Sequence, residues 1–121
     1  MTLNERIITA LVPLGISVDV TEHTPDGAER FCVIIPASDN FECCADDRPI
    51  SGTETAELAL YCKGNYLAFR DETLKLLVGA GITVTDARYL EFENDTKYHH
   101  CIFDVAAVRN YEEVFYGDNR T

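Results

Sequence analysis

Residues 98–103, with the sequence YHHCIF, bring two adjacent histidines and a cysteine into one short stretch. Zn²⁺ in proteins is bound by such side chains, and a cysteine beside a histidine base is also the basis of thiol nucleophiles. The other histidine and the other cysteines of the chain are His23, Cys32, Cys43, Cys44 and Cys62. Whether this stretch carries chemistry depends on which of these side chains can converge.

Strand geometry separates the two adjacent histidines. Residues 97–108 alternate as a β-strand does, and successive side chains of a strand point to opposite faces. We therefore expect His99 and Cys101 on one face and His100 on the other, unless a bulge turns one of them. A His99/Cys101 metal site needs two more ligands, and Cys62 is a candidate only if its strand is adjacent. Because the chain has no CxxC or HxxxH spacing, the pattern favours a packed strand over a metal site.

Elsewhere in the chain, the sequence gives little evidence for a reactive cysteine or for a nucleotide-binding loop. Cys43 and Cys44 are neighbours, so on a strand they face opposite sides and cannot easily bond to each other. A Cys62 nucleophile would need His99 or His100 as its base, but no glycine-lined oxyanion site accompanies it. No GxGxxG or GxxxxGK loop is present. The sequence predicts no catalytic residue, no cofactor site and no metal site.

The charge of the chain limits its partners. Ten Lys and Arg residues stand against 21 Asp and Glu residues, for a formal net charge of −11. Binding to nucleic-acid phosphates requires a basic surface, so the composition argues against specific nucleic-acid binding. A well-solvated surface is the plainest interpretation. The alternatives are a surface that repels polyanions and a surface that meets a basic partner.

Length and hydropathy indicate one domain that does not enter a membrane. The chain has 121 residues, of which 46% are hydrophobic, and this is enough for one core. It has no apolar run near the roughly 18 residues that span a bilayer. Its start lacks the basic region and the cleavage site of a signal peptide. We therefore expect a soluble, non-exported protein with reduced cysteines.

The first half of the chain predicts a helix followed by four strands. Thr2 and Glu5 form a capping box, and apolar residues then recur at helical spacing for about three turns, until Pro13 and Gly15. The strands are expected around Ile16–His23, Arg30–Ile35, Phe41–Ala45 and Glu54–Lys63. A turn at Thr24-Pro25-Asp26-Gly27 would make the first two strands an antiparallel hairpin. A flexible loop is expected from Asp39 to Thr53, overlapping the third strand.

The second half predicts one helix and two strands. Asn65 can cap a helix over Tyr66–Ala80, and Gly81 suits its left-handed end. Strands over Ile82–Phe92 and Lys97–Val108 follow. The order α-β-β-β-β-α-β-β indicates an α+β fold, with a largely antiparallel or mixed sheet and both helices on one face. We expect residues 1–111 to form a single domain and residues 112–121 to form a flexible C-terminal tail.

Three segments of the second half, taken together, resemble a known family. They are ELALYCKGNY at 57–66, a helix that closes with Gly79-Ala80-Gly81, and YLEFENDTKYHH at 89–100. They are similar to the tail-terminator, or tail-completion, proteins of long-tailed phages and prophages, and the likeness covers about residues 46–108. Tyr61 stands where such proteins often have Trp, and His100 where they often have Lys.

The resemblance implies a virion structural protein without enzymatic activity. Such subunits form a ring, commonly a hexamer, that caps the tail tube and joins it to the head. The implied partners are other copies of the chain, the tail tube protein and the head–tail connector proteins. The resemblance places the protein at the head–tail interface of the virion, after assembly in the host cytoplasm. An acidic lumen would let DNA pass without holding it.

Two alternatives to a tail subunit remain open from the sequence. The first is a small acidic adaptor domain that binds a basic protein partner through its charged surface. The second is a thiol or metal enzyme built on Cys62, His99 and Cys101.

Overall fold

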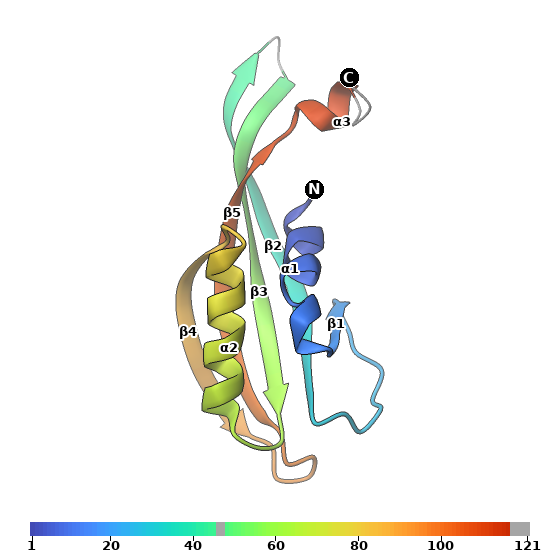
Figure 1. The fold of residues 1–121 in the computed structure, drawn as a ribbon. Coiled ribbons are helices and arrows are strands. Elements are labelled where there is room, and N and C mark those ends of the chain that lie inside the picture. Colours follow the sequence, from blue (N-terminus) through green and yellow to red (C-terminus); the bar gives the residue numbers. More distant parts are fainter. Residues whose placement is uncertain (46–47, 117–121) are drawn as a thin grey trace.

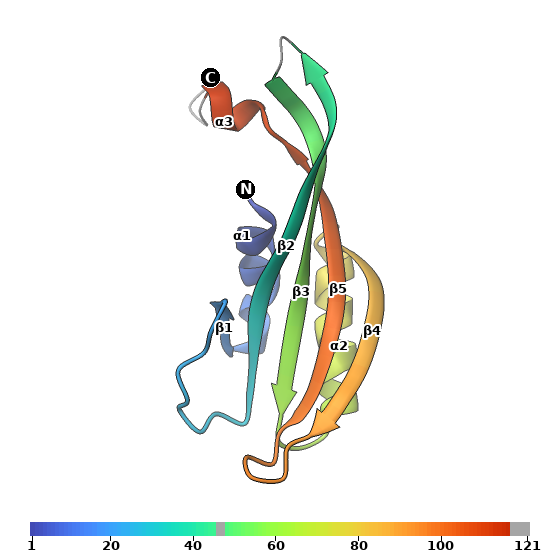
Figure 2. The same cartoon turned by 180° about the vertical axis from the view of Figure 1, so that it is seen from behind.

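The computed structural model describes residues 1–45 and 48–116, except for the side chains of Cys43 and Ala45. The elements in chain order are α1 (Leu3–Ala10), a 3₁₀ turn (Val12–Leu14), β1 (Ser17–Val20), β2 (Arg30–Ala45), β3 (Arg48–Cys62), α2 (Tyr66–Gly79), β4 (Thr83–Phe92), β5 (His99–Asn110) and α3 (Glu112–Tyr116). The strands form one sheet in the order β1-β2-β3-β5-β4. Figure 1 shows α1 and α2 on one face of this sheet, and Figure 2 shows the other face without a covering helix.

This arrangement confirms the predicted fold class. The sheet is mixed, because β1 runs parallel to β2 while the other neighbouring strands are antiparallel. The core lies between the sheet and the two main helices. Its fully buried side chains include Leu3, Ile7, Leu11, Ile34, Leu58, Phe69, Leu77, Phe103 and Val105. Among the described residues, no helix is long and apolar enough to cross a bilayer.

The two main helices begin where their capping residues predict. The Thr2 hydroxyl accepts a hydrogen bond from the Glu5 amide, and the Glu5 carboxylate accepts one from the Thr2 amide at 2.9 Å. Asn65 caps α2 by accepting from the Ala68 amide at 3.1 Å. The first helix is shorter than expected: it ends at Ala10, and the predicted third turn is a 3₁₀ turn that contains Pro13. The ring of Pro13 lacks the N–H that a continuing α-helix needs.

The predicted hairpin between the first two strands is wrong. β1 and β2 lie side by side in parallel, with Ser17 opposite Phe31 and Val20 opposite Ile34. The chain turns directly after β1, where Thr21 has a φ of 75° and the Glu22 amide donates to the Val20 carbonyl at 2.9 Å. It then returns along the sheet before β2 begins. Asp26 is expected in a tight turn, but its carboxylate instead forms hydrogen bonds with the His23 ring and with the Ala28 amide.

The predicted break between the second and third strands is also wrong. β2 is a continuous strand of 16 residues, so the sheet has one strand fewer than expected. Irregular pairing between Pro36 and Ser38 and again beyond Phe41 lets it run through a proline. The segment Asp39 to Thr53, expected as a flexible loop, consists of paired β2 and β3 strands in its described part. We call residues 38–45 and 48–55 the arm, which continues past the start of α1 (Figure 1).

The C-terminal segment lies against the arm. The Tyr111 amide donates to the Ile50 carbonyl at 2.7 Å, and the Tyr111 ring meets the Phe41 ring edge-on at 5.0 Å. Arg109 donates to Glu113 at 3.0 Å, in the first turn of α3. The expected C-terminal tail thus begins with a short helix, and its residues 117–121 lie outside the described part of the chain.

Candidate functional site

The face of the sheet opposite the helices carries a second apolar cluster. Its buried members are Phe31, Val33, Ala59, Tyr98 and Ile102, and Tyr61 is half-buried against them. On β2, β3 and β5 these residues alternate with the residues of the helix-side core, as strand geometry requires, and Tyr98 directly precedes β5. No helix covers this cluster within the described residues, so it is the natural place to look for a binding site (Figure 2).

Four rings form a continuous stack across this face. His23 lies on Phe31 with a centroid distance of 3.8 Å, Phe31 lies on Tyr61 at 4.6 Å, and Tyr61 lies on His100 at 4.3 Å. The register explains the order, because Phe31 is paired with Tyr61 across β2 and β3, and Tyr61 with His100 across β3 and β5. Such cross-strand pairs each add roughly 0.5–1.5 kcal/mol beyond their burial. The stack therefore fixes the shape of the uncovered face.

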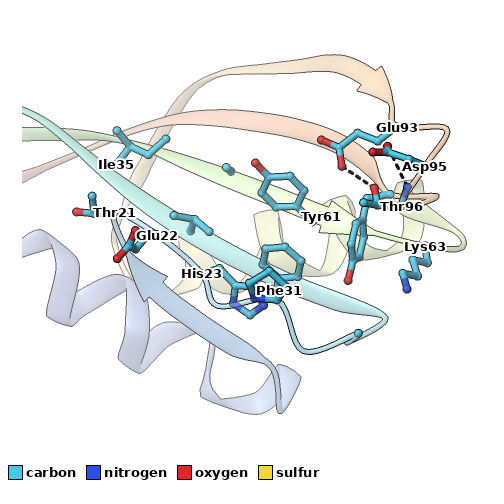
Figure 3. A pocket seen from close by; sticks show the side chains of 15 residues that line it. Thr21, Glu22, His23, Phe31, Ile35, Tyr61, Lys63, Glu93, Asp95 and Thr96 are labelled. Atoms are coloured by element: carbon cyan, nitrogen blue, oxygen red, sulfur yellow. Dashed lines mark hydrogen bonds between the residues drawn. The ribbon is translucent and has the colours of Figure 1, made fainter.

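A groove of about 550 Å³ lies over part of this stack. Figure 3 shows His23, Phe31 and Tyr61 along the sheet, with Glu93, Asp95 and Thr96 from the β4–β5 connection at one end. Glu22, Glu93, Asp95 and Lys63 are the charged side chains along the groove. The Lys63 ammonium lies 4.9 Å from the centre of the Tyr98 ring. The groove thus combines an aromatic and aliphatic floor with a mainly acidic rim.

His23 is held in place by two carboxylates. Its Nδ1 lies 2.6 Å from Asp19 Oδ2, and its Nε2 lies 3.2 Å from Asp26 Oδ1. The His23 side chain is only 8% exposed, whereas the side chains of Asp19 and Asp26 are 42% and 49% exposed. The hydrogen bond to Asp19 raises the pKa of His23, the burial of the ring opposes this, and Asp26 adds to the increase. Protonated His23 therefore suits its site, and the imidazolium joins β1 to the loop that lines the groove.

This raised pKa predicts a pH-dependent stability. A group that binds its proton more tightly when folded stabilises the fold fully below its unfolded pKa, near 6.5, and loses that contribution as pH rises through the folded value. We expect the destabilisation caused by His23→Gln to be larger at about pH 6 than at about pH 9, measured by urea unfolding at both pH values. In an Asp19→Asn background this pH dependence should largely vanish. An equal effect at both pH values would contradict the ion pair.

The structure separates the residues of the YHHCIF stretch as predicted. Cys101 is buried in the helix-side core, and His99 lies on the same face, where its Nδ1 is 3.0 Å from the Tyr89 hydroxyl oxygen. His100 points to the uncovered face, where it ends the ring stack. Burial lowers the pKa of His100, although Glu93 and Glu91 act in the opposite direction.

Cys62, His99 and Cys101 do not form the metal site that one of the alternatives requires. Cys62 does lie opposite His99 in the register of β3 and β5, so the expected adjacency is present. Among the described residues, however, Cys62, His99 and Cys101 do not bring their ligand atoms together. Burial raises the pKa of the Cys101 thiol, and it raises that of Cys32 to about 12. Buried thiols of this kind are poor nucleophiles.

Comparisons with known proteins leave the family of the chain open. No protein-family model matches the sequence, and no curated protein matches it. The function of the chain is therefore inferred from its residues and surfaces and from the resemblance of its three segments.

The groove cannot be found from the sequence alone, because its residues come from separate elements. The sequence places His23 at the end of one expected strand and Tyr61 within another, and it gives no sign that the two side chains lie on the same surface. The local signal was an alternation of aromatic and small residues in Phe31 and Val33 and again in Ala59 and Tyr61. The stack became visible only with the register, which sets Phe31 beside Tyr61 and Tyr61 beside His100.

Proposed function

We propose that this chain is a ring-forming structural subunit of the tail-terminator type, which caps the tail tube of a long-tailed phage and joins it to the head. The observation that carries the proposal is the arm, which extends past the helix-covered body and bears exposed apolar side chains. Those on or beside the arm are Phe41, Val108, Val114 and Phe115. Clustered apolar side chains outside a core mark surfaces that meet another protein. A ring subunit needs such surfaces to reach its neighbours.

The sheet also offers two free edges for contact between copies. In the described strands, β4 pairs only with β5, and its outer side is open. On the far side, β1 covers β2 only as far as Ile34, so the arm portion of β2 is a second open edge. Open edges are templates for pairing with another chain. Two different edges on opposite sides of one subunit permit a head-to-tail contact, which closes into a ring when the rotation allows it.

The charge supports passage of DNA more than binding of DNA. A net charge of −11 gives the subunit no general attraction for phosphates. A ring at the end of a tail tube has to let DNA slide through its lumen, and an acidic lining serves that purpose. The proposed partners are other copies of this chain, the tail tube protein and the head–tail connector proteins.

The proposal predicts assembly that depends on the arm. We expect a species near six subunits by light scattering after size exclusion at high protein concentration, or on addition of tail tubes. Val108→Asp, at a side chain that is 71% exposed beside the arm, should reduce this assembly at least severalfold. Val12→Asp is the matched control, because Val12 is 68% exposed in the 3₁₀ turn after α1 and is not part of the arm. A monomer that ignores both concentration and tail tubes would refute the proposal.

A second candidate function is an adaptor that binds a basic protein segment. The groove favours it, since Glu22, Glu93 and Asp95 surround an apolar floor of the size that a few side chains fill. One experiment distinguishes the two candidate functions. An adaptor stays monomeric and binds lysine- or arginine-rich peptides in a salt-dependent manner, and Glu93→Gln weakens that binding while Val108→Asp does not.

A further inference from the structure

A β-bulge in β4 places a carboxylate directly opposite His100. Tyr89 is paired with Cys101 and Glu91 with His100, so Leu90 is the extra residue of β4. Without the bulge, Leu90 would oppose His100 and Glu91 would point to the other face. Bulges commonly re-aim a side chain at a functional position. Here the bulge brings Glu91 and Glu93 to the same side of the sheet as the imidazole.

These three side chains converge. One ligand atom from each of Glu91, Glu93 and His100 lies within 4.8 Å of the other two. The His100 ring is fixed from the other side by its stack on Tyr61 at 4.3 Å. Thr96 donates to Glu93 Oε1 at 2.7 Å, which orients this carboxylate and leaves its second oxygen available. Outer partners of this kind orient the ligands of metal sites.

An independent feature of the imidazole points to a missing partner. His100 Nε2 is buried from solvent and has no hydrogen-bond partner among the described residues. A buried polar atom without a partner costs roughly 1–3 kcal/mol and calls for an explanation. The two carboxylates also repel each other across this small space, and the net charge of the chain does not relieve that repulsion. A cation bound between the three groups relieves this repulsion, and with Nε2 as its imidazole ligand it also gives that atom a partner.

We propose that Glu91, Glu93 and His100 bind one divalent transition-metal cation on the uncovered face of the sheet. Two carboxylate oxygens and one imidazole nitrogen suit ions such as Zn²⁺ and Co²⁺ better than Mg²⁺ or Ca²⁺, which prefer oxygen alone. Ligand atoms around tetrahedral Zn²⁺ are about 3.4 Å apart. The three ligand atoms here lie within 4.8 Å of one another, so each pair needs to approach by at most about 1.4 Å. Three protein ligands leave a coordination position open beside the groove. This inference goes beyond the proposed function and does not depend on it.

Co²⁺ titration of the full chain tests the site, because its absorption spectrum distinguishes oxygen and nitrogen ligands from thiolates. We expect one Co²⁺ per chain, displaced by Zn²⁺, with no thiolate charge-transfer band. Glu91→Gln and His100→Gln should each weaken binding by about tenfold or more. His99→Gln is the matched control, since the neighbouring histidine faces the other side of the sheet, and it should leave binding unchanged.

The two variants allow a loss of metal binding to be distinguished from a loss of folding. Glu91 is exposed, so Glu91→Gln should fold normally even if His100→Gln disturbs the ring stack, and circular dichroism checks both. Nuclear magnetic resonance of the wild type should place the paramagnetic shifts at Tyr61, Glu91 and Glu93. No saturable binding at millimolar Co²⁺, a thiolate band, or unchanged affinity in Glu91→Gln would each overturn the proposal.

Discussion

Phe103→Ala should lower the free energy of unfolding by about 3–5 kcal/mol, the range for truncating a buried aromatic side chain. Phe103 is 1% exposed and lies on β5 between Leu58 of β3 and Ala87 of β4 in the register of the sheet. It belongs to the core cluster with Phe69 and Leu77 of α2. Its removal leaves a cavity beneath the helices, where the packing of two layers limits relaxation.

Urea unfolding followed by circular dichroism measures this loss. Val108→Ala is the matched control on the same strand, because its side chain is 71% exposed and its truncation should change stability by about 0.5 kcal/mol or less. A loss below about 1 kcal/mol for Phe103→Ala would mean that α2 does not seal this part of the sheet.

The same strand shows how far local sequence reasoning reaches. Alternation along β5 predicts Cys101 and Phe103 on one face and His100 on the other. The structure has them so, and the first two lie on the helix side. The capping residues Thr2 and Asn65 located the starts of both main helices. These features depend on residues close together in the chain, and their geometry follows from the backbone alone.

The errors arose where distant residues decide the local conformation. Thr24-Pro25-Asp26-Gly27 has the composition of a tight turn, yet β1 pairs in parallel with β2, so the segment between them has to return along the sheet. The polar composition of Asp39 to Thr53 suggested a loop, although paired hydroxyls such as Ser38 and Thr55, 2.8 Å apart, support strands there. A partner strand supplies the hydrogen bonds that composition alone cannot reveal.

The candidate sites were less predictable than the fold for the same reason. The ring stack needs the pairing of β2 with β3 and of β3 with β5, which no single segment encodes. The side chains of Glu91 and His100 come together because of a one-residue bulge. Such a bulge moves every later side chain of its strand to the opposite face of the sheet. Sequence reasoning identified the two histidines as the place to look and allowed for a bulge, but it could not assign the bulge to the neighbouring strand β4.

Gly52→Ala tests the arm. A Cβ built at Gly52 would lie 2.2 Å from the Asn40 carbonyl oxygen and 3.2 Å from the Phe41 Cα. Both are backbone atoms, so no side-chain rotation relieves the clash, and the two strands must separate or change register. A glycine inside a strand often marks such a close approach of another backbone. We expect a loss of about 1–3 kcal/mol in the free energy of unfolding, the usual cost of overpacking.

Hydrogen exchange distinguishes a local change in the arm from a general loss of stability. Amides of residues 38–45 and 48–55 should exchange faster in Gly52→Ala, while those of β5 beside Phe103 keep their relative protection. Gly79→Ala is the matched control, because nothing lies within 4 Å of a Cβ at that last position of α2. It should be neutral or gain up to about 1 kcal/mol from reduced freedom of the unfolded chain. If both variants are equally stable and exchange alike, the two strands of the arm do not approach each other as closely as in the structure. The arm would then not hold the surface that we propose for subunit contact.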